Sequence, residues 1–225
     1  LVAGSLITQL MIVLDMTIIA IALPRMQEDL GLTSSQRPWA ITAYTLANGG
    51  LVLLGGRLTA VIGVRRSYWL GQAGFATASL IAGTATSFPV LVTARTAQGA
   101  FAALLGPTAL ALLNSAFPEG PRRRRVFALF GATGGVGAAA GLLIGGALTD
   151  WLDWRWSLYV NVPIATIGFL VGLRGLPAAN PRRDEPAFSD LSGLFLGCAA
   201  CFSAVFGLDR AEQTSWGSAS TIGWL

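Results

Sequence analysis

Seven long, nearly charge-free runs fill most of the chain and constrain its fold more than any other feature. A transmembrane helix needs roughly 20 apolar residues to cross about 30 Å of hydrocarbon, whereas a membrane barrel alternates apolar and polar residues with period two. The chain is 53% hydrophobic and 12% charged, which excludes an ordinary soluble domain. The sequence therefore predicts an all-α integral membrane protein whose membrane helices fall at about residues 1–23, 39–58, 67–86, 90–117, 126–148, 157–173 and 191–208.

The arginines between these runs predict the orientation of the chain. All 15 basic residues are arginine, and most of those other than Arg95 lie in one set of alternate loops or at the run end beside it, at positions 57, 65, 66, 122–125, 174, 182 and 183. The opposite set carries only Arg25, Arg37, Arg155 and Arg210. Because cytoplasmic loops are enriched in basic residues, we expect a multi-pass protein of the plasma (inner) membrane whose first helix runs outward. This topology explains the net charge of +4 better than a nucleic-acid partner does.

A polar segment at residues 177–190 is the one convincing boundary in the sequence. Its proline, arginine and acidic residues predict a cytoplasmic linker. We expect residues 1–176 to form a bundle of six helices, and residues 191–225 to form a seventh helix and the start of an eighth. Because the chain begins with Leu1 inside an apolar run and ends in another, we expect a fragment of a two-bundle transporter that lacks its C-terminal bundle and does not transport alone.

Two isolated charges stand out inside the apolar runs. Arg95 is the only charged residue within 67–118, and Asp15 is the only acidic residue in any of the runs. Burying a lone guanidinium in a bilayer costs at least about 2.5 kcal/mol, so Arg95 should have a partner. Counting ~1.5 Å per residue from Pro24 and Pro89 at the outer helix ends places Asp15 and Arg95 at similar depths, about 13 and 9 Å.

This expected pair, Asp15 with Arg95, is a candidate for proton coupling. The chain has no histidine, so any proton relay must use carboxylates. Protonation of Asp15 would change its pairing with the fixed charge of Arg95 and bias a conformational equilibrium. The alternative is a static ion pair that holds the first helix against the fourth. We favour the coupling role because charges inside a membrane usually serve function.

Glycines recur where helices could approach closely or move. Three of them occupy every fourth position of the fifth run, which leaves a bare stripe on one helix face. Other glycines lie on both sides of the short turn between the second and third runs. Judged by spacing alone, the arginines of this turn only anchor the topology. We assign to gating and helix packing the residues Gly56, Gly63, Arg65, Gly137, Gly141 and Gly145.

No residues support an enzyme or a metal site. Cys198 and Cys201 form a C-x-x-C, but they lie in an apolar run where a thiol ionises with difficulty, and we interpret them as small packing residues. The sequence has no phosphate loop, no nucleophile elbow and no cluster with metal-ligand spacing. We therefore expect no enzymatic activity, no metal and no cofactor.

Four stretches carry recognisable motifs. They are Leu14-Asp15-Met16-Thr17 with Ala22-Leu23-Pro24, Arg95-Thr96-Ala97-Gln98-Gly99, residues 137–146, and the most specific match, Trp154-Arg155-Trp156-Ser157-Leu158-Tyr159-Val160-Asn161-Val162-Pro163. Together they resemble the major facilitator superfamily, and within it the fourteen-span drug:proton antiporter branch. The resemblance extends from the first helix to the seventh.

The resemblance implies two six-helix bundles that alternately open a site between them, and export of hydrophobic drugs or antibiotics against inward proton flow. In that family the arginine matched by Arg95 is implicated in proton transfer, which agrees with coupling through Asp15. We assign Thr17, Gln98 and Asn161 to the substrate cavity. The proton gradient would supply energy without a cofactor. The implied partners are a small hydrophobic substrate, protons, the lipid bilayer and the missing C-terminal bundle.

Three positions depart from the family pattern. Ala60 stands where the family usually has an aspartate of a charge relay, Leu142 where proline follows glycine in the fifth helix, and Ala20 where asparagine is common. These departures leave open a degenerate, non-transporting membrane protein as an alternative. A sugar or metabolite facilitator is a third interpretation, but it predicts more polar cavity faces than Gln98 and the few hydroxyls provide.

Overall fold

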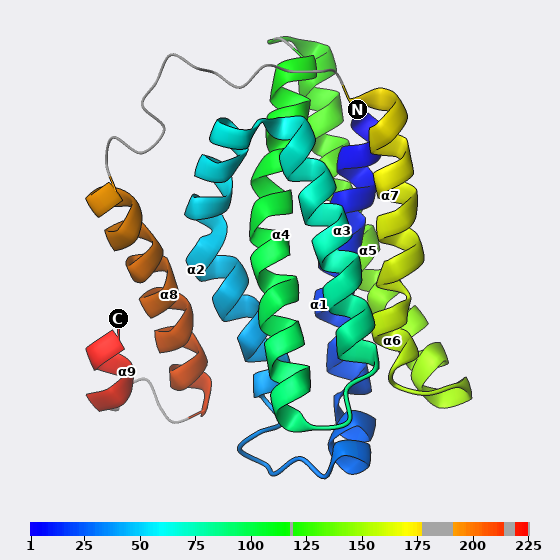
Figure 1. The fold of residues 1–225 in the computed structure, drawn as a ribbon, viewed down its shortest axis with the longest axis vertical. Helices are drawn as coiled ribbons and strands as arrows, with labels where there is room; N and C mark the ends of the chain where they lie inside the picture. The colour runs from blue at the N-terminus through cyan, green and yellow to red at the C-terminus, as the bar shows by residue number, and fades with distance from the viewer. Residues whose placement is uncertain (118, 177–190, 214–218, 225) are drawn as a thin grey trace.

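Helices make up all the regular secondary structure of the described residues, which are 1–117, 119–176, 191–213 and 219–224 of this computed structural model (Figure 1). They are α1 (Val2–Leu30), α2 (Trp39–Ile62), α3 (Val64–Gly83), α4 (Phe88–Ala116), α5 (Pro121–Trp151), α6 (Trp156–Tyr159), α7 (Asn161–Gly175), α8 (Leu191–Gln213) and α9 (Ala219–Trp224). The predicted all-α class is confirmed. The linker expected at 177–190 lies outside the described residues.

Six described segments are long and apolar enough to cross a membrane: α1, α2, α4, α5, α6 together with α7, and α8. The sequence predicts a further span at α3, which has the length but is less apolar. Arg65 and Arg66 open this helix, and its buried face carries Ser67, Gln72 and Ser79. α3 still runs alongside α4 and α7 in the bundle (Figure 1). The chain is therefore a multi-pass membrane protein.

Several helices extend beyond the apolar runs. α1 continues through Pro24 to Leu30 and ends where Gly31 adopts a left-handed conformation with φ 61°. α5 begins at Pro121, ahead of the expected start at residue 126. Proline is favoured in a first turn because its missing N–H would have no helical partner there. Hydropathy thus locates the apolar part of each helix but not its ends.

The helix expected at 157–173 is interrupted at Val160, which separates α6 from α7. Pro163 has no N–H, so the carbonyl of Tyr159 four residues earlier lacks its helical donor. The backbone of Val160 stays in the helical region, with φ −59° and ψ −25°, so the chain continues in the same direction. The interruption makes Asn161 the first residue of α7.

α4 lies between α2 and α3, and α1 and α5 lie behind α3 in the view of Figure 1. Half of the apolar part of α1 (50%) and of α4 (56%) is buried inside the protein, compared with 11% for α5 and 6% for α8. α8 packs against α2 and α9 packs against α8. Polar side chains such as Asp15, Arg95 and Gln98 are therefore shielded on the inner faces of α1 and α4, whereas α5 and α8 present apolar surface.

The glycine stripe of α5 faces α1. A Cβ atom on Gly141 would overlap the Thr17 hydroxyl, and one on Gly145 would lie 2.9 Å from Cγ1 of Ile18. Gly137 is also buried at this contact. The absence of side chains at these positions lets the two helix backbones approach closely.

A second close crossing, between α2 and α4, depends on glycines outside that stripe. A Cβ atom on Gly55 would overlap the Ala103 carbonyl, and one on Gly99 would overlap the Tyr44 carbonyl. This crossing brings the start of α2 close to Arg95, which lies one turn before Gly99.

Candidate functional site

Asp15 and Arg95 form a buried ion pair between α1 and α4. Arg95 Nη1 lies 2.6 Å from Asp15 Oδ2, and the side chains of Arg95 and Asp15 are 1% and 0% exposed. Both charges have lost their hydration, so such a pair is stable only when further hydrogen bonds satisfy both groups. The contact expected from helix depth is present. A role in proton coupling stays a prediction.

Two further hydrogen bonds of Arg95 reach groups on α2 and α4. Its Nε donates to the Ala40 carbonyl at 2.8 Å, and its Nη1 donates to Gln98 Oε1 at 3.0 Å. The guanidinium carbon lies 4.6 Å from the centre of the Tyr44 ring. A planar guanidinium can make these contacts at the same time, whereas a lysine ammonium is a compact point charge. The buried charge of Arg95 is thus compensated by protein groups.

The second carboxylate oxygen of Asp15 accepts hydrogen bonds from two side-chain amides. Gln98 Nε2 donates to Oδ1 at 3.2 Å, and Asn161 Nδ2 donates to it at 2.6 Å. Gln98 Nε2 also donates to Ser79 Oγ at 2.7 Å. These contacts join α1, α2, α3, α4 and α7. We call the following six buried residues the Asp15 cluster: Asp15, Tyr44, Ser79, Arg95, Gln98 and Asn161.

The three residues assigned to a substrate cavity lie in two different places. Gln98 and Asn161 are fully buried and hydrogen-bonded to Asp15. Thr17 donates its hydroxyl to carbonyls of its own helix and packs against Gly141 of α5. Their contact with a substrate stays a prediction.

Ser79 and Tyr44 belong to the Asp15 cluster but were not expected from the sequence. A serine and a tyrosine inside apolar runs carry no distinctive pattern. They become recognisable only when α3 and α2 are placed beside α4. By contrast, the position of Gln98 one turn after Arg95 is a usable signal, because residues three apart on a helix share a face.

The α2–α3 turn holds the other residues assigned to gating. Gly63 forms the turn with φ 88° and ψ 147°, and Gly56 lies about two helical turns earlier with space for a side chain. The guanidinium carbon of Arg65 lies 4.5 Å from the centre of the Trp69 ring, and its Nε is buried without a hydrogen-bond partner. Ala60 is exposed. Position 60, where the family usually has an aspartate, thus offers no side-chain acceptor to the arginines of this turn.

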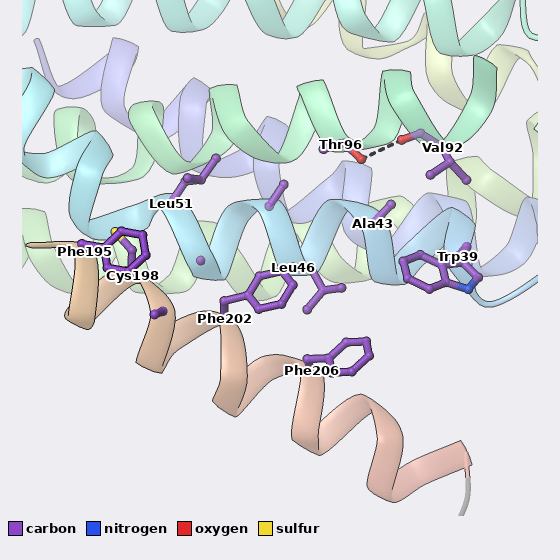
Figure 2. A pocket seen from close by; sticks show the side chains of 13 residues that line it. Trp39, Ala43, Leu46, Leu51, Val92, Thr96, Phe195, Cys198, Phe202 and Phe206 are labelled. Carbon is purple, nitrogen blue, oxygen red and sulfur yellow. Dashed lines mark hydrogen bonds between the residues drawn. The ribbon is translucent and has the colours of Figure 1, made fainter. Parts of the chain in front are cut away.

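An apolar groove of about 470 Å³ lies between α2, α4 and α8. Figure 2 shows Phe195 and Phe202 of α8 facing α2 across this groove. Thr96 is its one hydroxyl-bearing lining residue, and that hydroxyl donates to the Val92 carbonyl at 2.8 Å. Cys198 also lines the groove and carries a free thiol. The lining therefore offers apolar contact and few hydrogen bonds.

This groove lies close behind the Asp15 cluster. Ala43 and Thr96 line the groove, whereas their sequence neighbours Tyr44 and Arg95 belong to the cluster. The two sites are therefore separated by a single layer formed by α2 and α4.

A second ion pair, between Arg155 and Asp29, lies at the end of the bundle where α1 terminates. Arg155 Nη1 lies 2.8 Å from Asp29 Oδ2, and Trp154 Nε1 donates to the same oxygen at 3.1 Å. Arg155 Nη2 donates to the Ala85 carbonyl at 3.3 Å. These contacts fasten the end of α1 to the segment before α6 and to the α3–α4 turn. Within the described residues, no group of three His, Cys, Asp or Glu side chains could hold a metal.

Comparison with known proteins agrees with this architecture. The model of the Major Facilitator Superfamily matches residues 5–223. The puromycin resistance protein pur8 of Streptomyces alboniger is 49% identical over 94% of the chain, which spans 42% of that protein. The cephamycin export protein CmcT of Amycolatopsis lactamdurans is 40% identical over 93% of the chain, which spans 43% of that protein. The chain thus covers less than half the length of these relatives.

A solved structure shows the same fold. The crystal structure of a peptide transporter, POT, in complex with sulfate matches 98% of this chain and 48% of its own, with a TM-score of 0.73 and 16% identity. At this identity the match supports the fold alone. The matched family and relatives are transporters and not enzymes. The motifs, the helical bundle and the family match over residues 5–223 show that the chain belongs to the Major Facilitator Superfamily.

Proposed function

We propose that the chain is the proton-coupling bundle of a secondary active exporter, which expels hydrophobic drugs or antibiotics in exchange for protons by alternating access. The observation that carries this proposal is the buried ion pair of Asp15 and Arg95, 2.6 Å apart. The names of the relatives, a puromycin resistance protein and a cephamycin export protein, support the substrate class. Because the chain spans 42% and 43% of those proteins, the full cycle would need a C-terminal bundle as partner.

The energy of the ion pair is comparable with the energy that a conformational switch needs. A proton on Asp15 neutralises one partner and leaves Arg95 charged in a buried site. Breaking a buried pair in this way costs roughly 3–5 kcal/mol. A two-state equilibrium moves from 1:99 to 99:1 with about 5.5 kcal/mol. Protonation of Asp15 therefore supplies most of the energy needed to switch between two arrangements of α1 and α4, and the proton gradient would be the energy source without a cofactor.

The apolar groove between α2, α4 and α8 supports a hydrophobic substrate. Its volume of about 470 Å³ falls within the range of roughly 300–1,000 Å³ that is usual for drug-sized ligands. A sugar or another polar metabolite would lose its hydrogen bonds to water in such a lining. The groove therefore favours an exporter of hydrophobic compounds over a facilitator for sugars.

The distribution of arginines supports the proposed orientation. Basic residues concentrate on the cytoplasmic side of membrane proteins. We therefore place the protein in the plasma (inner) membrane, with residues 177–190 in the cytoplasm.

The test is proton-driven export by the full-length protein in proteoliposomes, with puromycin as the probe and an imposed pH gradient. We expect puromycin to move against proton flow, and Asp15→Asn to lower this flux at least about tenfold, which corresponds to ~1.4 kcal/mol. Asp150→Asn is the matched control, because Asp150 is an exposed carboxylate at the end of α5. Export that persists in Asp15→Asn at the rate of the unmodified protein would overturn the proposal.

A non-transporting membrane protein is the second candidate, and the α2–α3 turn favours it. Arg65 has a buried Nε without a hydrogen-bond partner, and exposed Ala60 stands where the family usually has an aspartate. A lost charge relay at this turn would impair gating while leaving the bundle intact. Absence of any gradient-driven flux in the unmodified full-length protein would select this candidate.

A further inference from the structure

Asn161 brings a side-chain amide to Asp15 from α7, which contributes no other residue to the Asp15 cluster. Its Nδ2 donates to Asp15 Oδ1 at 2.6 Å, and the residue is fully buried. Its other polar atom, Oδ1, is buried and has no hydrogen-bond partner. Leaving a buried polar atom unpaired costs about 1–3 kcal/mol, so the unpaired oxygen calls for an explanation.

The protonated, neutral form of Asp15 supplies that explanation. A charged carboxylate only accepts hydrogen bonds, whereas a protonated carboxyl also donates its O–H and needs an acceptor. Arg95 carries donors only, and Gln98 Oε1 already accepts from Arg95. Among the described residues that hydrogen-bond to Asp15, only Asn161 has a buried acceptor without a partner.

Asn161 can present this acceptor without a movement of the backbone. The terminal torsion of an asparagine side chain is broad and roughly two-fold. Turning the amide over exchanges the positions of Nδ2 and Oδ1 within nearly the same volume. A charged Asp15 favours the nitrogen in contact, as the structure has it, and a protonated Asp15 favours the oxygen.

We propose that Asn161 is a positioning residue that responds to the protonation of Asp15. Its amide nitrogen donates to the charged carboxylate, and the amide turns over when Asp15 takes up a proton, so that Asn161 Oδ1 accepts the carboxyl O–H. The proton stays on Asp15, and only hydrogen bonds change. This inference rests on the proposed proton-coupled function and adds to it the neutral group that stabilises the protonated state.

Few charged or titratable groups surround this contact. Arg95 from α4 and Tyr44 from α2, whose ring lies under the guanidinium, belong to the same cluster as Asp15. α3 contributes a neutral serine hydroxyl, and α5 faces α1 with its glycine stripe. The one titratable side chain of α6, Tyr159, packs against α3. The pH response of the amide is therefore assigned to Asp15.

The test uses infrared difference spectroscopy on the full-length protein during a pH titration. The band of the protonated Asp15 carboxyl is identified because it disappears in Asp15→Asn. The band of the Asn161 side-chain carbonyl is identified because it shifts with isotope-labelled asparagine and disappears in Asn161→Leu. In the unmodified protein we expect the two bands to titrate together. This measurement does not depend on transport, so its outcome is separate from that of the proposed function, which fails if puromycin export shows no proton coupling.

Two variants then test the contact itself. Asn161→Leu removes the donor and the acceptor, and Asn161→Asp replaces the donor with oxygen while keeping the shape. In Asn161→Leu, the charged and the protonated state of Asp15 each lose one hydrogen bond, so we expect the pH midpoints of the carboxyl band and of export to stay within about half a pH unit of those of the unmodified protein. In Asn161→Asp, the protonated state keeps an acceptor, whereas the charged state loses its donor and faces a second carboxylate, so we expect both midpoints to rise by at least about one pH unit. Ser157→Ala is the matched control, because Ser157 is buried one turn earlier and lies outside the Asp15 cluster. Its midpoint should not move.

The proposal is overturned if the Asn161 carbonyl band does not change as Asp15 titrates. It is equally overturned if Asn161→Leu raises the midpoint as far as Asn161→Asp does, because Asn161 would then act only as a donor to the charged carboxylate. The band measurement uses the unmodified protein, so it decides the question even where neither variant folds.

Discussion

Arg95 shows how a single side chain can be buried as a cation. Its guanidinium donates to the Ala40 carbonyl, to Asp15 and to Gln98, and it lies over the ring of Tyr44. These partners come from three helices, so the fit depends on the planar geometry of the guanidinium as much as on its charge. The residue therefore couples the positions of α1, α2 and α4.

Removing one charge of the pair should destabilise the protein more than removing both. Arg95→Ala leaves Asp15 buried without a compensating charge, for which we expect a loss of about 3–5 kcal/mol in the free energy of unfolding. The double variant Asp15→Asn with Arg95→Ala should lose less, because no unpaired charge remains. Unfolding of the purified single and double variants measures this coupling as a double-mutant cycle. Additive losses would contradict it.

A carboxylate placed at position 60 should form an ion pair with an arginine of the α2–α3 turn. Arg65 has an unpaired Nε, and Ala60 is exposed nearby in the sequence. We expect Ala60→Asp to stabilise the protein by roughly 0.2–1 kcal/mol and to increase puromycin export, because a surface ion pair contributes about this much. Ala60→Asn is the control without charge. Equal behaviour of the two variants would show that the charge has no effect.

The close contact between α1 and α5 links the packing of these two helices to the Asp15 cluster. The backbones of these helices approach so closely that glycine is required on α5 opposite Thr17 and Ile18. The pair of helices carries Asp15 on one side and the exposed apolar face of α5 on the other. A change in the spacing of α1 and α5 therefore reaches the Asp15 cluster.

Two glycines of α5 should respond in opposite ways to the same substitution. Gly141→Ala places a Cβ atom on the Thr17 hydroxyl, and we expect a loss of roughly 1–3 kcal/mol from overpacking. Gly146→Ala meets no atom within 4 Å and should gain up to about 1 kcal/mol, because alanine favours a helix more than glycine does. Thermal unfolding of both variants in detergent compares them. A similar shift in both would contradict the close packing at Gly141.

At the scale of the whole molecule, a polar cluster and an apolar groove lie back to back across α2 and α4. Only one layer of helices separates Arg95 in the cluster from Thr96 in the groove. A movement of α4 that follows protonation of Asp15 must also change the shape of the groove. If the proposed function holds, this arrangement gives a short physical route between Asp15 and a substrate in the groove.

Filling the groove should weaken substrate binding without disturbing the ion pair. Thr96 is exposed in the groove, and Thr93 is equally exposed one turn earlier on α4, in a hollow against α3. We expect Thr96→Trp to raise the KM for puromycin export at least about tenfold, or ~1.4 kcal/mol, and Thr93→Trp to leave it unchanged. Transport kinetics of both variants in proteoliposomes provide the measurement. An unchanged KM in Thr96→Trp would place the substrate elsewhere.

The sequence by itself determined the class of the protein and the approximate positions of its helices, and it placed Asp15 and Arg95 at similar depths. Each of these follows from hydropathy and from distance along a helix, which are properties of a single segment. The family motifs also identified the superfamily correctly. The ends of α1 and α5 were missed because helical hydrogen bonds continue past the apolar residues. The span expected at α3 is less apolar than the others because polar side chains, among them Gln72 and Ser79, lie on its buried face.

The tertiary structure alone decided which side chains surround the ion pair. Ser79 and Asn161 meet Asp15 and Gln98 only because glycines let the helices pack closely and at fixed rotations, and no periodicity along one helix contains that information. The same packing makes Asn161 a neighbour of Asp15, and its contact with a substrate stays a prediction. Depth is encoded along a helix, but the face that a helix turns to its neighbours is set by the fit between helices.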